Sequence, residues 1–209
     1  MVLNVITAII AYLIGSINFS VILSKKMAGF DVREKGSGNA GTTNMLRSVG
    51  KKAAALTLIC DILKGIVAIL IAMFIGWAFQ VENQSLLVQI AGIAVVIGHT
   101  FPVFFGFKGG KGVATSLGIL IMSNWQIGLI CLVFGVLLIA LTRMVSLGSC
   151  AAAVLFPVLT LFITENYIVT QGSGYLIYSI ILAVIVLFNH RSNIKRILAG
   201  KENKISFKK

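Results

Sequence analysis

The residues best suited to chemistry form one run of small and amide-bearing side chains, residues 36–44, followed three positions later by Arg47. Glycines tolerate positive φ, so successive backbone N–H groups can turn toward one point and bind an anion. Hydroxyl, amide and guanidinium groups add donors suited to phosphate. We therefore predict a phosphate site, with a flexible linker as the alternative. The predicted site residues of this run are Gly36, Ser37, Gly38, Asn39, Gly41, Thr43, Asn44 and Arg47.

The same run matches the GxGxxG pattern through Gly36, Gly38 and Gly41. That pattern indicates a dinucleotide site only after a strand and inside a βαβ unit. Here a long apolar stretch and a charged turn at residues 25–35 precede the glycines, and no βαβ unit follows. A Rossmann site is therefore set aside, while the anion-binding property of the glycines remains.

A second glycine loop, residues 107–115, carries two lysines and leads directly into an apolar segment. Backbone N–H groups, a helix dipole and ammonium groups can converge there on one anion. The loop is not a Walker A motif, because a glycine follows Lys111 where Ser or Thr should coordinate Mg²⁺. We predict a second phosphate site, with a basic juxtamembrane turn as the alternative. Its residues are Lys108, Gly109, Gly110, Lys111 and Gly112.

A third polar cluster, residues 189–196, ends the last apolar segment. His190 and Asn193 are three residues apart and share one helical face, where the histidine can accept a proton and the asparagine can donate to a carbonyl or phosphate. Arg191 and Arg196 are predicted to bind substrate. Basic residues at a membrane surface can also bind lipid headgroups, which is the alternative.

The other ionisable and thiol groups are assigned to structure. Asp61 and Lys64 lie within an apolar helix and are interpreted as a structural ion pair, because charges there are costly. His99 precedes a proline bend and is expected to be packed. No His, Cys, Asp or Glu grouping has metal-ligand spacing, so no metal site is predicted. Three cysteines are expected to be buried thiols: Cys60, Cys131 and Cys150.

The composition of the 209 residues indicates a membrane protein, since 58% are hydrophobic and 11% are charged, against about 25% charged in soluble domains. The net charge of +12 could suggest nucleic acid, but the cations lie between apolar segments long enough to span a bilayer, so the positive-inside rule accounts for most of them. We expect contact with membrane lipid and no nucleic-acid partner. Continuous apolar runs exclude a β-barrel.

The charge distribution predicts one polytopic all-α domain with seven transmembrane helices, the N-terminus outside and the C-terminus cytoplasmic. All 18 Lys and Arg residues except Lys64 then lie on one side. Six crossings, with residues 113–142 as one kinked or re-entrant unit, is the alternative. The expected spans are 2–23, 53–75, 86–105, a short 113–122, 125–142, 145–164 and 174–190. The loops at 24–52 and 106–113 and the tail 190–209 are expected in the cytoplasm, and those at Glu82 and Glu165 outside.

Three ordered blocks resemble the bacterial acyl-phosphate:glycerol-3-phosphate acyltransferases (PlsY). The blocks are residues 36–47, residues 98–102 with 107–115, and residues 190–196 with Gly200 and Glu202. With Asp61, Lys64 and Gly65 they cover nearly the whole chain. Asn18 departs from the proline found in many members, which alters the first helix but no motif residue.

The resemblance implies transfer of a fatty acyl group from acyl phosphate to the sn-1 hydroxyl of glycerol 3-phosphate, giving lysophosphatidic acid and phosphate at the cytoplasmic face of the bacterial inner membrane. It implies functional roles for Ser37, Arg47, Lys108, His190, Asn193 and Glu202, with the loop around Lys111 as the glycerol 3-phosphate site. An acyl phosphate is already activated, so no cofactor is expected. The protein must position two substrates, neutralise their phosphates and stabilise an oxyanion. Either His190 or a substrate phosphate can take the hydroxyl proton.

Two other function classes remain as alternatives. A small anion transporter could also gather glycine loops and cations near helix ends, but transporters show repeats and midplane sites, whereas these motifs crowd one face. A CDP-alcohol phosphotransferase needs a metal-binding cluster of aspartates, and Asp31 and Asp61 are the only two in the chain.

Overall fold

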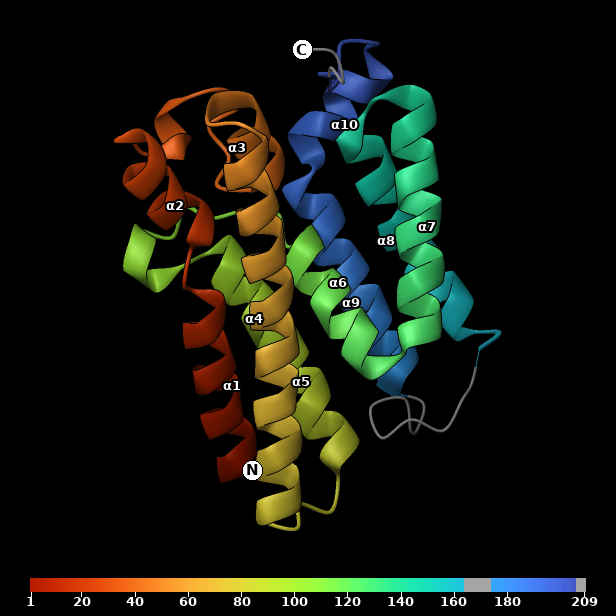
Figure 1. The fold of residues 1–209 in the computed structure, drawn as a ribbon. Coiled ribbons are helices and arrows are strands. Elements are labelled where there is room, and N and C mark those ends of the chain that lie inside the picture. The colour runs from red at the N-terminus through yellow and green to blue at the C-terminus, as the bar shows by residue number, and fades with distance from the viewer. Residues whose placement is uncertain (164–173, 206–209) are drawn as a thin grey trace.

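The computed structural model describes residues 1–163 and 174–205, and the regular elements within these ranges are all helical (Figure 1). In chain order they are α1 (Val2–Gly15), α2 (Phe19–Ala28), η1 (Val32–Glu34), α3 (Thr42–Ser48), α4 (Lys51–Ala78), α5 (Gln84–Thr100), η2 (Val103–Phe105), α6 (Val113–Ser123), α7 (Trp125–Thr142), α8 (Val145–Thr160), α9 (Gly174–Asn189) and α10 (Arg191–Leu198). The external loop predicted at Glu165 lies outside the described residues.

Within the described ranges, four helical stretches are long and apolar enough to cross a membrane: Val2–Ala28, Lys51–Ala78, Gln84–Phe105 and Trp125–Thr142. The pair α9 and α10, bent by 66°, would add a fifth. α6 has only 11 residues, so it extends about 16 Å, roughly half of a hydrocarbon core of about 30 Å. In its described part the chain is therefore an all-helical membrane protein, and the number of seven crossings stays a prediction.

The first predicted span, residues 2–23, consists of two helices, because Asn18 starts a new one. Its Oδ1 accepts hydrogen bonds from the backbone N–H of Val21 at 3.3 Å and from the hydroxyl of Ser20 at 2.7 Å. Such a cap satisfies N–H groups that the first helical turn leaves without a partner. The residue that departs from the family pattern is thus the N-cap of α2.

A second asparagine cap divides the long uncharged stretch between Lys111 and Arg143. Asn124 has an extended backbone, with φ −157° and ψ 92°, and its Oδ1 accepts a hydrogen bond from the N–H of Ile127 at 3.0 Å. The chain therefore forms the short α6 and the longer α7, which agrees with the two helices predicted for this stretch.

Glycines let neighbouring helices approach closely. A Cβ on Gly15 of α1 would lie 2.2 Å from the carbonyl oxygen of Val95 in α5, and one on Gly118 of α6 would lie 2.1 Å from that of Ile62 in α4. Small residues commonly allow such contacts between membrane helices. A larger side chain at either glycine would separate the helices that carry the polar loops.

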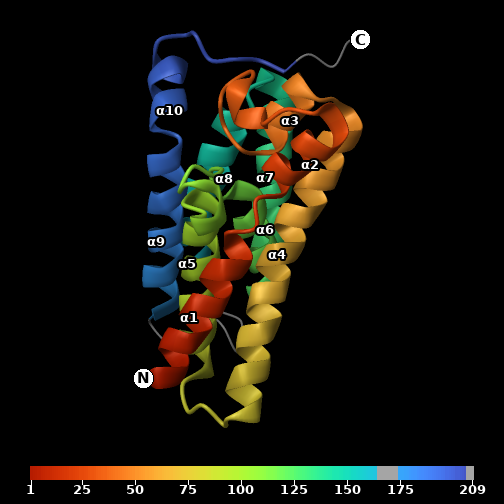
Figure 2. The same cartoon turned by 90° about the vertical axis from the view of Figure 1, so that its left-hand side faces the viewer.

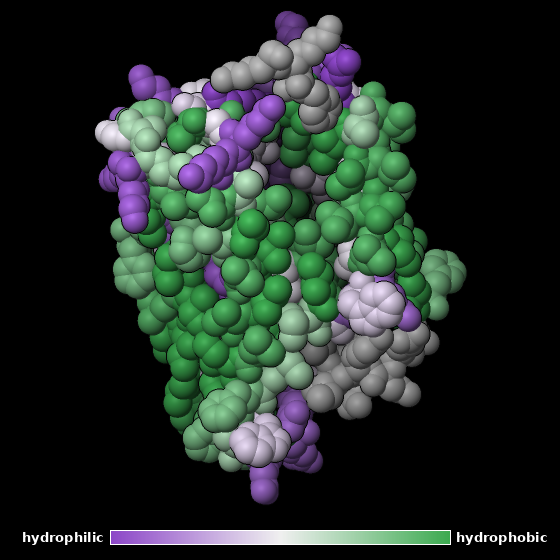
Figure 3. Space-filling view, viewed as in Figure 1, coloured by the Kyte–Doolittle hydropathy of each residue, from purple (hydrophilic) through white to green (hydrophobic). Residues whose placement is uncertain are grey.

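The two ends of the bundle differ in character. The N-terminus lies at one end, whereas α2, α3, α10 and the C-terminal tail lie at the other (Figures 1 and 2). Hydrophobic residues cover most of the visible face, and hydrophilic residues gather most densely at the end that holds α2, α3 and α10 (Figure 3). The first and third polar motifs are therefore at the same end of the molecule, although more than a hundred residues separate them.

Candidate active site

The first glycine run folds around the side chain of Asn44, which is buried at the start of α3. Its Oδ1 accepts a hydrogen bond from the N–H of Ser37 at 2.9 Å. Gly36 and Gly38 have φ of 59° and 71°, which other residues rarely adopt. The Nδ2 group of Asn44 donates to the carbonyls of Val32 (2.8 Å), Lys35 (3.0 Å) and Asn39 (3.0 Å). This geometry favours a positioning role for Asn44 over the substrate contact predicted for it.

The outer part of the run is accessible. Ser37 and Gly38 are exposed, and Gly41 and Thr43 are half-buried where α3 begins. Arg47, one turn later, is exposed, and its Nη2 donates to the carbonyl of Asn203 in the C-terminal tail at 3.4 Å. The first motif therefore contacts the tail that carries Glu202.

Arg33 connects the first glycine run to the second glycine loop, a role that the sequence did not reveal. Its Nη1 donates to the carbonyl oxygens of Phe105 at 2.6 Å and Lys108 at 3.1 Å. Its Nε and Nη2 donate to the two carboxylate oxygens of Asp31, at 3.0 and 2.8 Å. These bonds from Arg33, against the opposing effect of burial, hold the pKa of Asp31 below its usual range. Arg33 therefore fixes the two loops relative to each other.

The second glycine loop packs on the end of α5. The N–H groups of Gly109 and Gly110 donate to the carbonyls of Thr100 and His99, both at 3.0 Å. A Cβ on Gly110 would lie 2.1 Å from Nε2 of His99 and 2.7 Å from the carbonyl oxygen of Ala40. These two N–H groups are thus already engaged, so we assign both glycines to loop packing in place of the predicted phosphate contact. Gly112, at φ 87°, then begins α6.

Glu202 organises the third motif. Its carboxylate accepts hydrogen bonds from Asn193 Nδ2 at 2.8 Å, Ser146 Oγ at 3.0 Å and Arg196 Nε at 2.9 Å. Burial raises its pKa, but these three donors outweigh burial and hold the pKa below its ordinary value. Lys111 Nζ donates to Asn193 Oδ1. Glu202 therefore positions Asn193 and Arg196, and Ser146 joins the site without having been predicted.

Lys111 and His190 have strongly altered acidities. Burial, with the positive charges of Arg196 and Arg47, lowers the pKa of Lys111 to about 8, against the opposing effect of Glu202. His190 lies between α9 and α10, where burial and the Lys111 ammonium lower its pKa to about 4. Its Nδ1 is 2.8 Å from the carbonyl oxygen of Val186, which assigns the proton of the neutral ring to Nδ1 and leaves Nε2 as an acceptor.

Two predicted cations lie away from this network. The side chain of Lys108 is exposed, and the carbonyl of Lys108 accepts a hydrogen bond from Arg33. Arg191 is exposed, lies 4.6 Å from the ring centroid of Phe188 and donates to the Phe188 carbonyl at 3.1 Å. The structure thus brings Arg47, Lys111 and Arg196 together, while Arg191 points to the surface.

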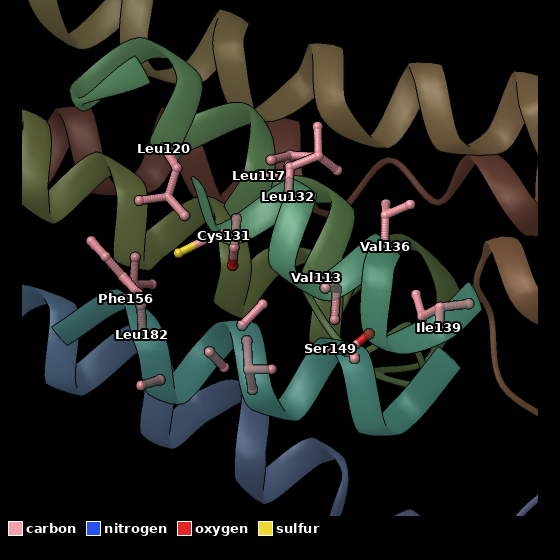
Figure 4. A pocket seen from close by; sticks show the side chains of 17 residues that line it. Val113, Leu117, Leu120, Cys131, Leu132, Val136, Ile139, Ser149, Phe156 and Leu182 are labelled. Atoms are coloured by element: carbon pink, nitrogen blue, oxygen red, sulfur yellow. The ribbon is translucent and has the colours of Figure 1, made fainter. Parts of the chain in front are cut away.

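An apolar cavity of about 130 Å³ lies between α6, α7, α8 and α9 (Figure 4). Val113, which follows Gly112, and Val186, whose carbonyl faces His190, both line it. Leu120 and Phe156 lie toward its other end (Figure 4). The cavity therefore extends from the polar network into the helical bundle.

In the part of the chain that the structure describes, no group of three or more His, Cys, Asp or Glu residues could hold a metal ion. The donor set near the cavity consists of Lys, Arg, Asn and His, with one carboxylate. Such a set suits an anion better than a cation.

The amino-acid sequence is similar to those of known proteins over nearly its whole length. The family model for glycerol-3-phosphate acyltransferase matches residues 5–200. The glycerol-3-phosphate acyltransferase of Thermoanaerobacter pseudethanolicus is 48% identical over 204 residues, covering 98% of this chain and 96% of that protein. That of Clostridioides difficile is 43% identical over 205 residues, covering 98% and 97%.

Solved structures agree with this likeness. The glycerol 3-phosphate form of PlsY (YgiH), an integral membrane glycerol 3-phosphate acyltransferase, is similar with a TM-score of 0.84 and 34% identity, covering 97% of this chain and 96% of that chain. Its lysophosphatidic acid form is similar with a TM-score of 0.82 and 32% identity, covering 97% and 95%.

Proposed function

Because the chain belongs to the glycerol-3-phosphate acyltransferase family and is an enzyme of that activity, we propose that it moves a fatty acyl group from acyl phosphate to the sn-1 hydroxyl of glycerol 3-phosphate. The products are lysophosphatidic acid and inorganic phosphate. One observation carries the site assignment: hydrogen bonds through Asn193 and Glu202 join Lys111 to Arg196 beside the buried His190, at the polar end of an apolar cavity.

The cavity is the site for the acyl chain. Its lining comes almost entirely from apolar side chains of α6 to α9, and each buried methylene group contributes about 0.8 kcal/mol to binding. Since Val113 and Val186 line the cavity near the polar network, an acyl chain within it would present its carbonyl group near Lys111 and His190.

The cations serve the two substrate phosphates. Glycerol 3-phosphate and acyl phosphate are both anions, so bringing them together costs electrostatic repulsion that positive groups can offset. Arg47 donates to the carbonyl of Asn203, next to Glu202 in the C-terminal tail, and Glu202 holds Arg196 in place. Ser37 of the first glycine run and Lys108 of the second glycine loop have exposed side chains, which supply further donors that can approach a phosphate from outside the network.

The reaction needs no covalent enzyme intermediate. The sn-1 oxygen attacks the acyl carbon, a new ester C–O bond forms, and the bond between the acyl carbon and the bridging oxygen breaks. The hydroxyl proton passes to the phosphate that leaves. A phosphate with a second pKa of about 6 is a stronger base than an imidazole with a pKa of about 4, so we assign His190 Nε2 to orienting a glycerol hydroxyl. A loss of about two to four orders of magnitude in His190→Gln would instead make His190 the base.

For the membrane arrangement we propose seven crossings of a bacterial inner membrane, with the N-terminus outside and the site at the cytoplasmic face. The opposite positions of the N-terminus and the C-terminal tail support an odd number of crossings (Figures 1 and 2). Lys and Arg residues gather in the loops next to the site, as the positive-inside rule expects for the cytoplasmic side. Single-cysteine probes at Gly38 and Glu82 test this, since an external reagent should label only the second; labelling of Gly38 would reverse the orientation.

The donor is tested with purified protein in detergent, glycerol 3-phosphate and one of three donors: acyl phosphate, acyl-coenzyme A or acyl carrier protein. Lysophosphatidic acid should form from acyl phosphate alone, and a chelator should leave the rate unchanged. Formation from a thioester at a similar rate, or a requirement for Mg²⁺, would contradict the proposed donor and site.

A further inference from the structure

A cluster of three buried ionisable side chains lies next to the site and takes no part in the chemistry proposed above. Asp61 and Lys64 of α4 and His99 of α5 are each at most 4% exposed. Lys64 Nζ is 3.0 Å from Asp61 Oδ1 and 2.8 Å from His99 Nδ1. Charged groups within a membrane bundle are costly and need partners. Such residues often have a functional role in addition to neutralising one another.

The lysine binds a third element, the end of α1. Its Nζ donates to the carbonyl of Gly15 at 3.1 Å and to that of Ile17 at 3.0 Å. These carbonyls flank the break between α1 and α2, where the last turn of a helix leaves acceptors without backbone donors. Lys64 therefore joins α1, α4 and α5 at one point, beside the break that redirects the chain into α2 and the first glycine run.

The histidine supports the second glycine loop directly. The carbonyl of His99 accepts from the N–H of Gly110, and its ring Nε2 would lie 2.1 Å from a Cβ on the same glycine. The carbonyl oxygen of Ala40, from the first glycine run, would lie 2.7 Å from the same Cβ on Gly110. Lys64 therefore fixes the orientation of the His99 ring, and this ring packs against Gly110, the residue before Lys111.

We propose that Asp61, Lys64 and His99 form a positioning unit for the phosphate of glycerol 3-phosphate, acting through Gly110 to hold Lys111 in place. Asp61 keeps the lysine ammonium in the apolar interior, the lysine fixes the His99 ring, and the ring supports the loop. The proposal rests on the proposed function, in which the Lys111 loop binds this phosphate. A purely structural ion pair would behave differently: its loss would lower stability and weaken the binding of both substrates equally.

The test compares substrate kinetics of three variants with those of wild type. Lys64→Met, Asp61→Asn combined with Lys64→Met, and His99→Leu should each raise KM for glycerol 3-phosphate by about tenfold or more, as expected from losing one charge-assisted hydrogen bond, while KM for acyl phosphate and kcat change by less than about threefold. The double variant removes both charges, which buried sites often tolerate, so it decides the outcome if Lys64→Met does not fold. His99→Asn, whose oxygen can stand in for Nδ1, should recover part of the lost affinity.

Thr57→Val is the matched control, because Thr57 is a buried polar residue of the same helix whose hydroxyl donates only to the Ala53 carbonyl of its own helix, at 2.8 Å. It should keep both KM values near those of wild type. Hydrogen exchange should become faster in the peptide that covers residues 106–112 in the three variants, but not in the control.

Two failures are distinguishable. If wild type transfers no acyl group to glycerol 3-phosphate, the proposed function falls and the positioning role falls with it. If wild type and Thr57→Val are active, but the double variant and His99→Leu keep normal KM for glycerol 3-phosphate or lose affinity for both substrates equally, only the positioning role is overturned.

Discussion

Replacing Lys111 gives a pH signature that can be worked out from the structure. Lys111 Nζ donates to Asn193, and burial lowers its pKa to about 8. Below this pH the ammonium is present and can bind phosphate; above it the charge is lost. Since kcat/KM reports ionisations of the free enzyme, kcat/KM for glycerol 3-phosphate should fall about tenfold per pH unit above about pH 8.

Two variants separate Lys111 from other groups that titrate in this range. Lys111→Met should lower kcat/KM at neutral pH by about 10- to 100-fold, because a hydrogen bond to a charged group contributes about 1.5 to 3 kcal/mol, and its remaining activity should be flat across the alkaline range. Lys111→Arg keeps its charge to above pH 12, so it should also abolish the decline while retaining more activity.

The assay is steady-state release of phosphate from acyl phosphate at varied glycerol 3-phosphate, from about pH 6.5 to 9.5, corrected for spontaneous hydrolysis of acyl phosphate. The substrate phosphate is already doubly ionised above about pH 7, so its own titration does not produce the predicted limb. A decline near pH 8 that persists in Lys111→Arg would refute the assignment of Lys111 to the phosphate site.

Arg47→Ala should lower kcat/KM for glycerol 3-phosphate by about 10- to 100-fold. Lys195→Ala, on the exposed side of α10, is the control and should change it by less than about twofold. If both variants keep the kcat/KM of wild type, Arg47 serves only to orient the protein in the membrane. Glu202→Gln should lower the free energy of unfolding by about 1 to 3 kcal/mol. In wild type the stability from ionised Glu202 is present above its unfolded pKa of about 4.3 and is lost as pH falls through its lower folded pKa. The melting temperature of the variant should therefore fall less than that of wild type when the pH is lowered. A variant with the melting temperature of wild type at every pH would contradict the stabilising hydrogen bonds of Glu202. Cys131→Phe should slow transfer of long acyl chains more than medium chains, with Cys131→Ala as the control, and equal effects on both lengths would place the acyl chain outside the cavity.

Much of the helical framework could be predicted, because apolar runs and charge distribution are local properties of a membrane sequence. The break at residues 123–124 was predicted from the excess length of an uncharged stretch. The break before α2 was not predicted, since residues 2–23 read as one apolar run. It depends on Asn18, whose capping bonds to Val21 and Ser20 carry little signal in composition.

Residue types and spacing predicted three polar motifs, but they could not predict which residues hold the loops in place and which face a ligand. Asn44 and Glu202 have the same polar character as substrate ligands, yet their oxygen and nitrogen atoms are engaged within the protein. Arg33 and Ser146 join the site only because loops distant in sequence meet in the fold. Contacts of this kind depend on tertiary packing, which one sequence does not display.

Oxygen-isotope tracing tests the central claim, acyl transfer from acyl phosphate to glycerol 3-phosphate, most directly. The donor carries oxygen-18 at the bridge between carbonyl carbon and phosphorus, and products of the purified enzyme are analysed by mass spectrometry. Attack at the acyl carbon predicts that the label appears in inorganic phosphate, in an amount equal to the lysophosphatidic acid formed, and that the ester carries none. Label in a released fatty acid, together with phosphate transferred to the glycerol compound, would contradict acyl transfer and show attack at phosphorus.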